Sequence, residues 1–338
     1  MNQAGYPRRM PKAFDLGIPA LEGDIERVEV ALKESVRTDD PFLTEVASHL
    51  INAGGKRLRP TLALCAAYAG PGAGVNGSAS ESVVNGAVAA ELVHLGSLYH
   101  DDVIDEATTR RGVQSVNARW SNIVAILTGD FLLARASEIA ASLGSDVAGL
   151  LAGTIGELCK GQMHELQYLF NIERSPDAYF SAIAGKTAAL MASSCRIGGM
   201  TGGLPEDSID ALSTFGYHTG IVFQIVDDVL DLTASADELG KPTCNDLIEG
   251  IYTLPVIDAL GEVPGLRDLL GSRLASGDAE KARALVTANG SIGNALAVGE
   301  SHAVQAVAAL GKADLDAAAV EALSGLPQMM LTRAQVSA

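Results

Sequence analysis

The stretch Glu91-Leu-Val-His-Leu-Gly-Ser-Leu-Tyr-His-Asp101-Asp-Val-Ile-Asp105 is an apolar segment that ends in carboxylates. The apolar spacing from about Val83 to Glu106 predicts one long helix. Positions four apart on a helix project from the same face, so Asp101 and Asp105 point the same way. Like charges at that spacing are unfavourable, and an Asp carboxylate is rarely buried without a partner. We therefore expect a cation beside this helix end.

A second copy of the pattern Asp-Asp-x-x-Asp occurs downstream, in Phe223-Gln-Ile-Val-Asp-Asp-Val-Leu-Asp231. One acidic cluster alone is often only a solvated helix end, but two matching clusters, each following an apolar helical run, make that interpretation much weaker. Two such clusters facing one cavity would form an all-oxygen site of the kind that holds Mg²⁺ together with water and substrate phosphates. The candidate metal ligands are Asp101, Asp102, Asp105, Asp227, Asp228 and Asp231.

Composition favours one all-α domain. Hydrophobic residues make up 48% of the 338 residues and aromatic residues only 4%, so the core volume must come from Ala, Leu, Val and Ile, which suits close-packed helices. No convincing β-alternation appears, and no linker divides the chain. We expect a mobile arm over residues 1–20 and a single helical domain over residues 21–338. Helices are predicted at about 40–53, 58–70, 80–106, 116–142, 145–171, 175–200 and 205–233, then a polar loop at 234–252 and shorter Ala-rich helices within 253–335.

Charge and cysteine usage limit the partners and the compartment. The chain has 41 acidic and 24 basic residues, a formal net charge of −17, which argues against nucleic acid and anionic membrane surfaces as general partners. The four cysteines lie far apart without a Cys-x-x-Cys motif, which indicates buried free thiols in a reducing compartment. No segment reaches the length of a transmembrane span. We expect a cytoplasmic protein without a transmembrane segment.

The two acidic motifs, together with Gly54-Gly-Lys-Arg-Leu-Arg-Pro60 upstream, resemble the trans-isoprenyl diphosphate synthases, or polyprenyl synthases. The resemblance covers about residues 20 to 300. It implies a bundle of long helices around a central cavity and head-to-tail condensation of isopentenyl diphosphate onto an allylic diphosphate. It also implies about three Mg²⁺ ions held by the carboxylates and the diphosphate. A homodimer is usual in the family, and the apolar helix around 116–142 is a candidate dimer face.

The resemblance assigns roles to two further sets of residues. The isopentenyl diphosphate site would be formed by Lys56, Arg59, His94 and Arg111. The allylic diphosphate and the reacting carbons would be contacted by Arg110, Lys186, Thr187, Gln224 and Lys241. An acid at Glu165, which follows Gln162, would support the metal ions.

The residue types suit these roles on physical grounds. Lysine offers a point charge and arginine a planar fork of donors for phosphate oxygens, and the glycines before Lys56 allow a tight turn. Structural alternatives remain, because basic residues near a helix start are often solvated, and a lone histidine such as His94 is more often a satisfied core residue. Two positions depart from the family pattern: Cys244 replaces a glycine and Ile251 a lysine. The second change removes a positive charge from the loop and puts a diphosphate role of position 251 in doubt.

Product length depends on the depth of the cavity along the helix before Asp101. Short-chain members of the family carry a bulky aromatic residue near position 96, whereas Gly96 and Ser97 leave a path toward Val93 and Ala89. We therefore expect a product of about C20 or longer, with a long polyprenyl chain favoured, and expect Gly96→Phe to shorten it. The alternatives are a farnesyl or geranylgeranyl diphosphate synthase, a terpene cyclase, a regulatory synthase subunit and an acidic helical metal-binding or scaffold protein without chemistry.

Overall fold

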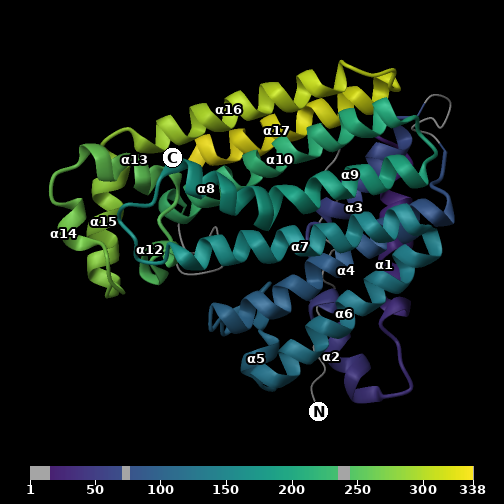
Figure 1. Cartoon of the computed structure of the whole chain (residues 1–338), viewed down its shortest axis with the longest axis horizontal. Helices are drawn as coiled ribbons and strands as arrows, with labels where there is room; N and C mark the ends of the chain where they lie inside the picture. The colour runs from purple at the N-terminus through teal and green to yellow at the C-terminus, as the bar shows by residue number, and fades with distance from the viewer. Residues whose placement is uncertain (1–15, 71–76, 235–243, 338) are drawn as a thin grey trace, which may run out of the picture.

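The computed structural model describes residues 16–70, 77–234 and 244–337, which form a helical protein with one small hairpin (Figure 1). The first half contains α1 (Leu21–Ser35), α2 (Pro41–Asn52), α3 (Leu58–Tyr68), α4 (Glu81–Ile104), β1 (Thr109–Arg110), β2 (Val113–Gln114), α5 (Val116–Arg119), α6 (Asn122–Leu143) and α7 (Ser145–Gln167). The second half contains α8 (Pro176–Ile183), the π-helical segment η1 (Ala184–Ala188), α9 (Ala189–Thr201), α10 (Glu206–Thr233), α12 (Asn245–Glu249), α13 (Leu254–Glu262), α14 (Leu266–Leu269), α15 (Ser276–Ala288), α16 (Ser291–Leu310) and α17 (Ala317–Ser337).

The long helices lie side by side around α9. Figure 1 shows α7, α9, α10 and α16 running together across the long dimension of the molecule. Helix α9 contacts both α4 and α10, the two helices that end in the acidic motifs, and α4 packs along α6. Because α4 and α10 both rest on α9, their acidic ends are brought to the same region.

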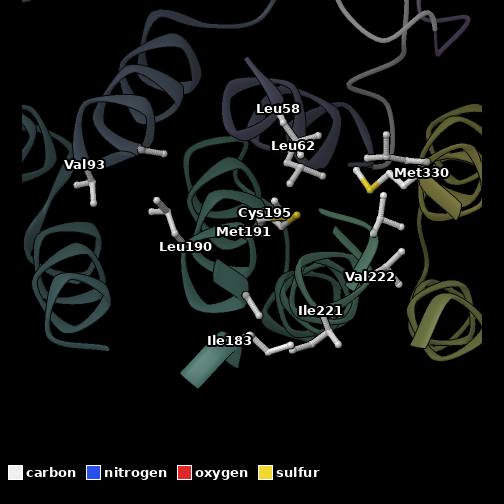
Figure 2. Packing of buried hydrophobic residues seen from close by; sticks show 14 of the residues in the cluster. Leu58, Leu62, Val93, Ile183, Leu190, Met191, Cys195, Ile221, Val222 and Met330 are labelled. Carbon is white, nitrogen blue, oxygen red and sulfur yellow. The ribbon is translucent and has the colours of Figure 1, made fainter. Parts of the chain in front are cut away.

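The core is built mainly from aliphatic side chains, as the low aromatic content predicts. Figure 2 shows Leu62 of α3, Cys195 of α9 and Val222 of α10 packed together with Met330 of α17. Small residues let these helices approach closely: a Cβ at Gly198 would lie 2.0 Å from the carbonyl oxygen of Ala63. Interiors this dense tolerate little change in volume.

Several details differ from the sequence-based expectation. The short hairpin β1–β2 was not predicted; its two turn residues, Arg111 and Gly112, both have positive φ, the backbone that a two-residue hairpin turn requires. The helix expected at 116–142 is interrupted before Ser121, whose hydroxyl accepts a hydrogen bond from the Val124 N–H and caps α6. The helix expected at 175–200 contains the π-helical segment, which carries Lys186 and Thr187.

Other expectations concern segments that the structure describes only in part. Within the polar loop expected at 234–252, residues 245–249 form the short helix α12, and 235–243 lie outside the described residues. Most of the expected N-terminal arm also lies outside them. The prediction of buried thiols is wrong for Cys159, which is exposed on α7, because its helix faces solvent there. No helix in the described ranges combines the length and hydropathy needed to cross a membrane.

Candidate active site

A cavity of about 490 Å³ lies where the ends of α4 and α10 meet α7, η1 and the segment that contains α12. Asp101 and Asp105 reach it from α4, and Asp227 and Asp228 reach it from α10. The two acidic motifs therefore contribute four carboxylates to one cavity. No hydrogen bond or ion pair engages the carboxylates of Asp101, Asp105 or Asp227 within the described part of the chain.

The other two aspartates of the acidic motifs are buried outside the cavity lining. Asp102 is fully buried, and its Oδ1 accepts a hydrogen bond of 2.6 Å from Nε of Arg110. Asp231 is also buried, and its Oδ2 accepts a hydrogen bond of 3.3 Å from the backbone N–H of Asp246. Neither lines the cavity, so their role as metal ligands stays a prediction, and Asp102 in this structure orients Arg110 instead.

Three of the cavity carboxylates, those of Asp101, Asp105 and Asp228, have raised pKa values. Burial raises the pKa of Asp101 to about 6, with Asp105 adding to the shift and Lys186 opposing it. Burial raises the pKa of Asp228 to about 7, although hydrogen bonds from Tyr179 and Gln224 oppose the shift. Burial of negative charge in one place is costly, and a bound cation would relieve that cost.

The carboxylates line one cavity without forming a closed metal cage. Over the described ranges, no three acidic, histidine or cysteine side chains converge closely enough to hold an ion by themselves. An ion there would need oxygen ligands from water and from a bound phosphate group. Mg²⁺ is commonly held in this way, by one or two carboxylates together with substrate phosphates.

Lys186 supplies positive charge on the opposite wall. It belongs to the π-helical segment, and its ammonium pairs with the carboxylate of Glu165 on α7. Burial alone would lower the pKa of Lys186, but Glu165 and Asp101 raise it above its usual value. Lys186 therefore remains charged at neutral pH.

A chain of hydrogen bonds joins η1 to the second acidic motif. The Thr187 hydroxyl donates to Oε1 of Gln224 at 2.7 Å, and Nε2 of Gln224 donates to Oδ1 of Asp228 at 2.8 Å. The Tyr179 hydroxyl donates to Oδ2 of the same aspartate at 2.6 Å. Both oxygens of Asp228 are thus held, which fixes this carboxylate at the cavity edge.

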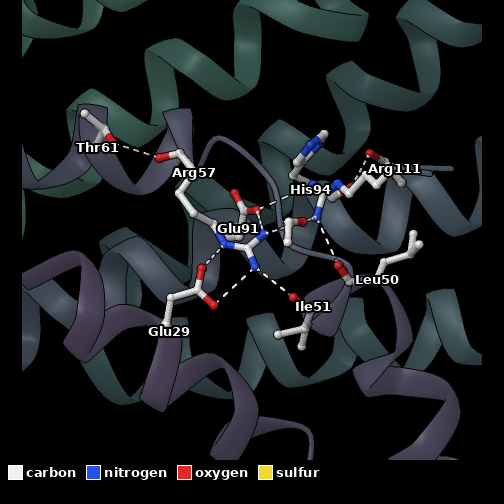
Figure 3. A network of polar contacts seen from close by, with 10 residues as sticks. Glu29, Leu50, Ile51, Arg57, Thr61, Glu91, His94 and Arg111 are labelled. Atoms are coloured by element: carbon white, nitrogen blue, oxygen red, sulfur yellow. Dashed lines mark hydrogen bonds and ion pairs between the residues drawn. The ribbon is translucent and has the colours of Figure 1, made fainter. Parts of the chain in front are cut away.

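The loop before α3 is anchored by a buried network (Figure 3). Arg57 has a left-handed backbone, and Figure 3 shows its guanidinium between Glu29 and Glu91. Its Nη1 donates to Glu91 at 3.0 Å, and its Nη2 donates to the carbonyl of Ile51 at 3.1 Å. The network holds the loop that leads to Arg59, which lines the cavity.

The residues expected to bind isopentenyl diphosphate are divided between the cavity and its surroundings. Arg59 and His94 line the cavity; burial lowers the pKa of Arg59 to about 10 and keeps the pKa of His94 well below its usual value. Arg111 donates to the carbonyls of Leu50 and Gly54 behind the wall. Lys56 is exposed and does not line the cavity.

Comparison with known proteins shows the family. The polyprenyl synthetase family model matches residues 40–309. The chain belongs to the polyprenyl synthetase family. The resemblance seen in the sequence is thereby confirmed, and the chain is a prenyltransferase of this family.

Individual relatives and solved structures support the same family assignment. The chain is 42% identical to heptaprenyl diphosphate synthase component 2 of Geobacillus stearothermophilus over 72% of this chain and 74% of the relative. It is 38% identical to nonaprenyl diphosphate synthase of Mycobacterium tuberculosis over 86% and 88% of the two chains. A polyprenyl synthase from Caulobacter crescentus, solved with calcium and isoprenyl diphosphate, superposes with a TM-score of 0.88 at 30% identity, covering 97% and 99%.

The surroundings of this polyprenyl synthase cavity also correct the expected path toward Val93. A Cβ at Gly96 would lie 3.1 Å from both the Gly129 carbonyl oxygen and the Leu133 side chain, so Gly96 faces α6. Ser97 lines the cavity, whereas Val93 is fully buried in the core. A phenylalanine at position 96 would therefore push α4 from α6 instead of simply closing a tunnel.

Sequence reasoning missed several cavity residues, because no motif marks them. They lie on the turn before α8, on α8 and around α12, and come from chain segments far from both acidic motifs. Those with polar side chains are Arg174, Tyr179, Asn245, Asp246, Glu249 and Thr253, together with Arg273 between α14 and α15. Lys241, which sequence reasoning did select, falls outside the described residues.

Proposed function

We propose that this chain condenses isopentenyl diphosphate head-to-tail onto an allylic diphosphate in a Mg²⁺-dependent reaction. One observation carries the proposal: both acidic motifs line a cavity whose other walls present Arg59, Arg110 and Lys186. Anionic substrates entering a chain of net charge −17 need such local positive charge.

The two diphosphates would bind at different walls. Lys186 and Arg110, whose charges both act on Asp101 and Asp105, suit the allylic diphosphate. Arg59 and His94, which also line the cavity, suit isopentenyl diphosphate, with Lys56 and Arg111 in support. The separation keeps the leaving group apart from the diphosphate that the product retains.

The donors present fit magnesium. The oxygens of Asp101, Asp105, Asp227 and Asp228 are hard ligands. Burial raises the pKa values of Asp101, Asp105 and Asp228, a cost of burying negative charge that a bound cation would relieve. When bound, Mg²⁺ neutralises charge on the departing diphosphate. A number of about three ions remains an expectation from the family.

The residues of the chain would act mainly by electrostatics and exclusion of water. The allylic C1–O bond breaks, the double bond of isopentenyl diphosphate forms the new C–C bond, and the released pyrophosphate takes the proton lost from the adjacent carbon. Lys186 and Arg110 provide fixed positive charge where negative charge develops. Leu98, Ile183 and Phe223 line the cavity and keep water from the carbocation.

A long product is the proposed outcome. Relatives at 42% and 38% identity are named heptaprenyl and nonaprenyl diphosphate synthases. Ser97 also leaves the cavity wall near Asp101 free of a bulky side chain. A cytoplasmic location is supported by Cys65 and Cys195, which are buried free thiols of the kind found in reducing compartments.

We propose a homodimer formed through α6. This helix exposes Ile123 by 70% and Leu127 by 63%, next to Ile126. Contiguous exposed apolar side chains of this kind mark interaction surfaces. Because some relatives are named as one component of a synthase, a different partner chain on this face is the alternative.

Light scattering of the protein as it elutes from a size-exclusion column tests whether the chain forms a dimer. We expect a dimeric wild type and a monomeric Leu127→Glu. Val304→Glu is the matched control, because Val304 is 69% exposed on α16, away from this face. A monomeric wild type would contradict the homodimer.

A radiolabel assay tests the function. The protein is incubated with labelled isopentenyl diphosphate and a farnesyl or geranylgeranyl primer, with and without Mg²⁺, and the products are sized by chromatography. We expect Mg²⁺-dependent polyprenyl diphosphates longer than about C20. Cyclised hydrocarbon would favour a terpene cyclase, and no incorporation would favour a regulatory subunit or a scaffold protein.

A further inference from the structure

Arg174 is a buried arginine in the turn between α7 and α8. Its side chain is 4% exposed and lines the cavity beside Lys186 and Asp228. Its Nη1 donates a hydrogen bond of 3.0 Å to the carbonyl of Tyr252, and its backbone N–H donates to the carbonyl of Asn171. One end of the guanidinium is therefore fixed to the segment that follows α12.

The other edge of this guanidinium has donors to spare. Nε and Nη2 of Arg174 are buried and make no hydrogen bond to any described residue. These two N–H groups lie on the same edge of the planar group and point in parallel, the geometry that matches two oxygens of a carboxylate or phosphate. A buried donor left without an acceptor costs free energy. Because the guanidinium is a cation, an anion is the acceptor that suits this edge best.

The nearby acids are engaged elsewhere. Asp228 accepts from Tyr179 and Gln224, and Glu165 is paired with Lys186. No described carboxylate lies within ion-pair distance of Arg174. The guanidinium carbon lies 5.6 Å from the centroid of the Tyr179 ring, a contact that stabilises a cation but satisfies neither free N–H.

We propose that Arg174 binds the diphosphate group of the allylic substrate side-on through Nε–H and Nη2–H. The same two N–H groups would bind the pyrophosphate that the reaction releases. The proposal rests on the proposed function, since it adds a residue to the same cavity. Arg174 would add a second cationic contact to that of Lys186, and Asp101, Asp105, Asp227 and Asp228 would hold the ions that neutralise the same diphosphate. Because the Tyr252 carbonyl already fixes Nη1, the guanidinium is held in place before the anion arrives, and the groups that cover its free edge have to move aside.

Titration calorimetry with inorganic pyrophosphate and Mg²⁺ on the full-length protein tests this role. We expect Arg174→Gln to weaken pyrophosphate binding about tenfold or more, because a bidentate charged contact is lost. Arg174→Lys keeps the charge but not the fork, so we expect an intermediate loss. Arg267→Gln is the matched control: Arg267 pairs with Glu173, the residue before Arg174, on the exposed side of the same turn, and we expect unchanged affinity.

The kinetic readout separates binding from folding. We expect Arg174→Gln to raise KM for the allylic diphosphate while leaving KM for isopentenyl diphosphate within about twofold. A folded Arg174→Gln with wild-type affinity for pyrophosphate would overturn the inference and leave the proposed function standing. A wild type that binds no Mg²⁺-pyrophosphate would overturn both.

A crystal structure of the wild type with Mg²⁺ and pyrophosphate tests the role of Arg174 even if the variants do not fold. The inference requires Nε and Nη2 within hydrogen-bond distance of phosphate oxygens. If that structure pairs both atoms with protein groups instead, Arg174 has only a structural role.

Discussion

Gly161 of α7 and Gly185 of η1 lie in direct backbone contact: a Cβ at Gly161 would be 2.2 Å from the backbone nitrogen of Lys186, and a Cβ at Gly185 would be 2.8 Å from the Cα of Gly161. This contact places Lys186 within reach of Glu165, one helical turn beyond Gly161. The pair of glycines thus determines the position of Lys186 at the cavity.

Gly161→Ala should therefore displace η1. We expect a loss of stability of about 1–3 kcal/mol from overpacking and a fall in kcat of at least about tenfold from the shifted Lys186. Thermal melting and the condensation assay measure the two effects. Gly293→Ala on α16 is the control, since a Cβ there meets nothing within 4 Å and alanine favours a helix. Equal activity of Gly161→Ala and the wild type would show that the close contact does not position Lys186.

Glu91→Gln should act on the isopentenyl diphosphate site from a distance. Glu91 is 1% exposed and pairs with Arg57, with Arg111 at 3.8 Å. Loss of one partner from a buried ion pair costs about 3 kcal/mol or more, and the loop that leads to Arg59 loses its anchor. We expect a lower melting temperature and a raised KM for isopentenyl diphosphate with little change in KM for the primer. Equal increases in both KM values would contradict this positioning role.

Ser97→Phe should shorten the product. Ser97 lines the cavity one turn before Asp101, so an aromatic ring there would occupy the space of the growing chain. Gly96→Phe, directed at Leu133 on α6, should mainly destabilise the fold by about 1–3 kcal/mol. Chromatography of products and thermal melting distinguish the two variants. A product of unchanged length from Ser97→Phe would place the limit of the cavity elsewhere.

Asp24 provides a pH-dependent part of the stability. It is 1% exposed and accepts hydrogen bonds from Tyr68, Ser78, Arg27 and the Ala79 N–H. Burial alone would raise the pKa of Asp24, but these hydrogen bonds together lower it below its usual value. A carboxyl group with a lowered pKa stabilises the fold above its unfolded pKa, and that stabilisation is lost as pH falls through the folded pKa.

Asp24→Asn should accordingly cost about 2–3 kcal/mol at pH 7. The difference from the wild type should shrink as pH falls below about 4, where the unfolded-state carboxyl protonates. Urea titrations at several pH values measure it. A difference that grows toward low pH would contradict the assignment.

The acidic ends of α4 and α10 and the basic loop before α3 were predictable because each is a contiguous run of residues with its own chemistry. Their shared cavity followed from the family pattern rather than from any spacing in the chain. The π-helical segment was marked by Lys186 and Thr187, although its geometry depends on the contact between Gly161 and Gly185, which no local pattern reveals.

Other parts depend on tertiary packing and left no local signal. Asp102 has the same residue type as Asp101, but the helix turns it toward Arg110 and away from the cavity. Arg174 and Tyr179 reach the cavity only because α8 folds back along α7, which brings Tyr179 to Asp228 of α10. The direction of Gly96 toward α6 likewise depends on how two helices cross, so the sequence could not show that Ser97 lines the cavity and Gly96 does not.

The central claim is that Asp101 and Asp227 serve one diphosphate in one cavity, and the most direct test is Mg²⁺-dependent condensation by Asp101→Ala and Asp227→Ala measured separately. We expect each variant to fold and to lose about 10³-fold in kcat/KM, or about 4 kcal/mol of transition-state stabilisation. Asp207→Ala, an exposed aspartate at the other end of α10, should keep wild-type activity. Near-normal condensation by either motif variant would contradict a shared site.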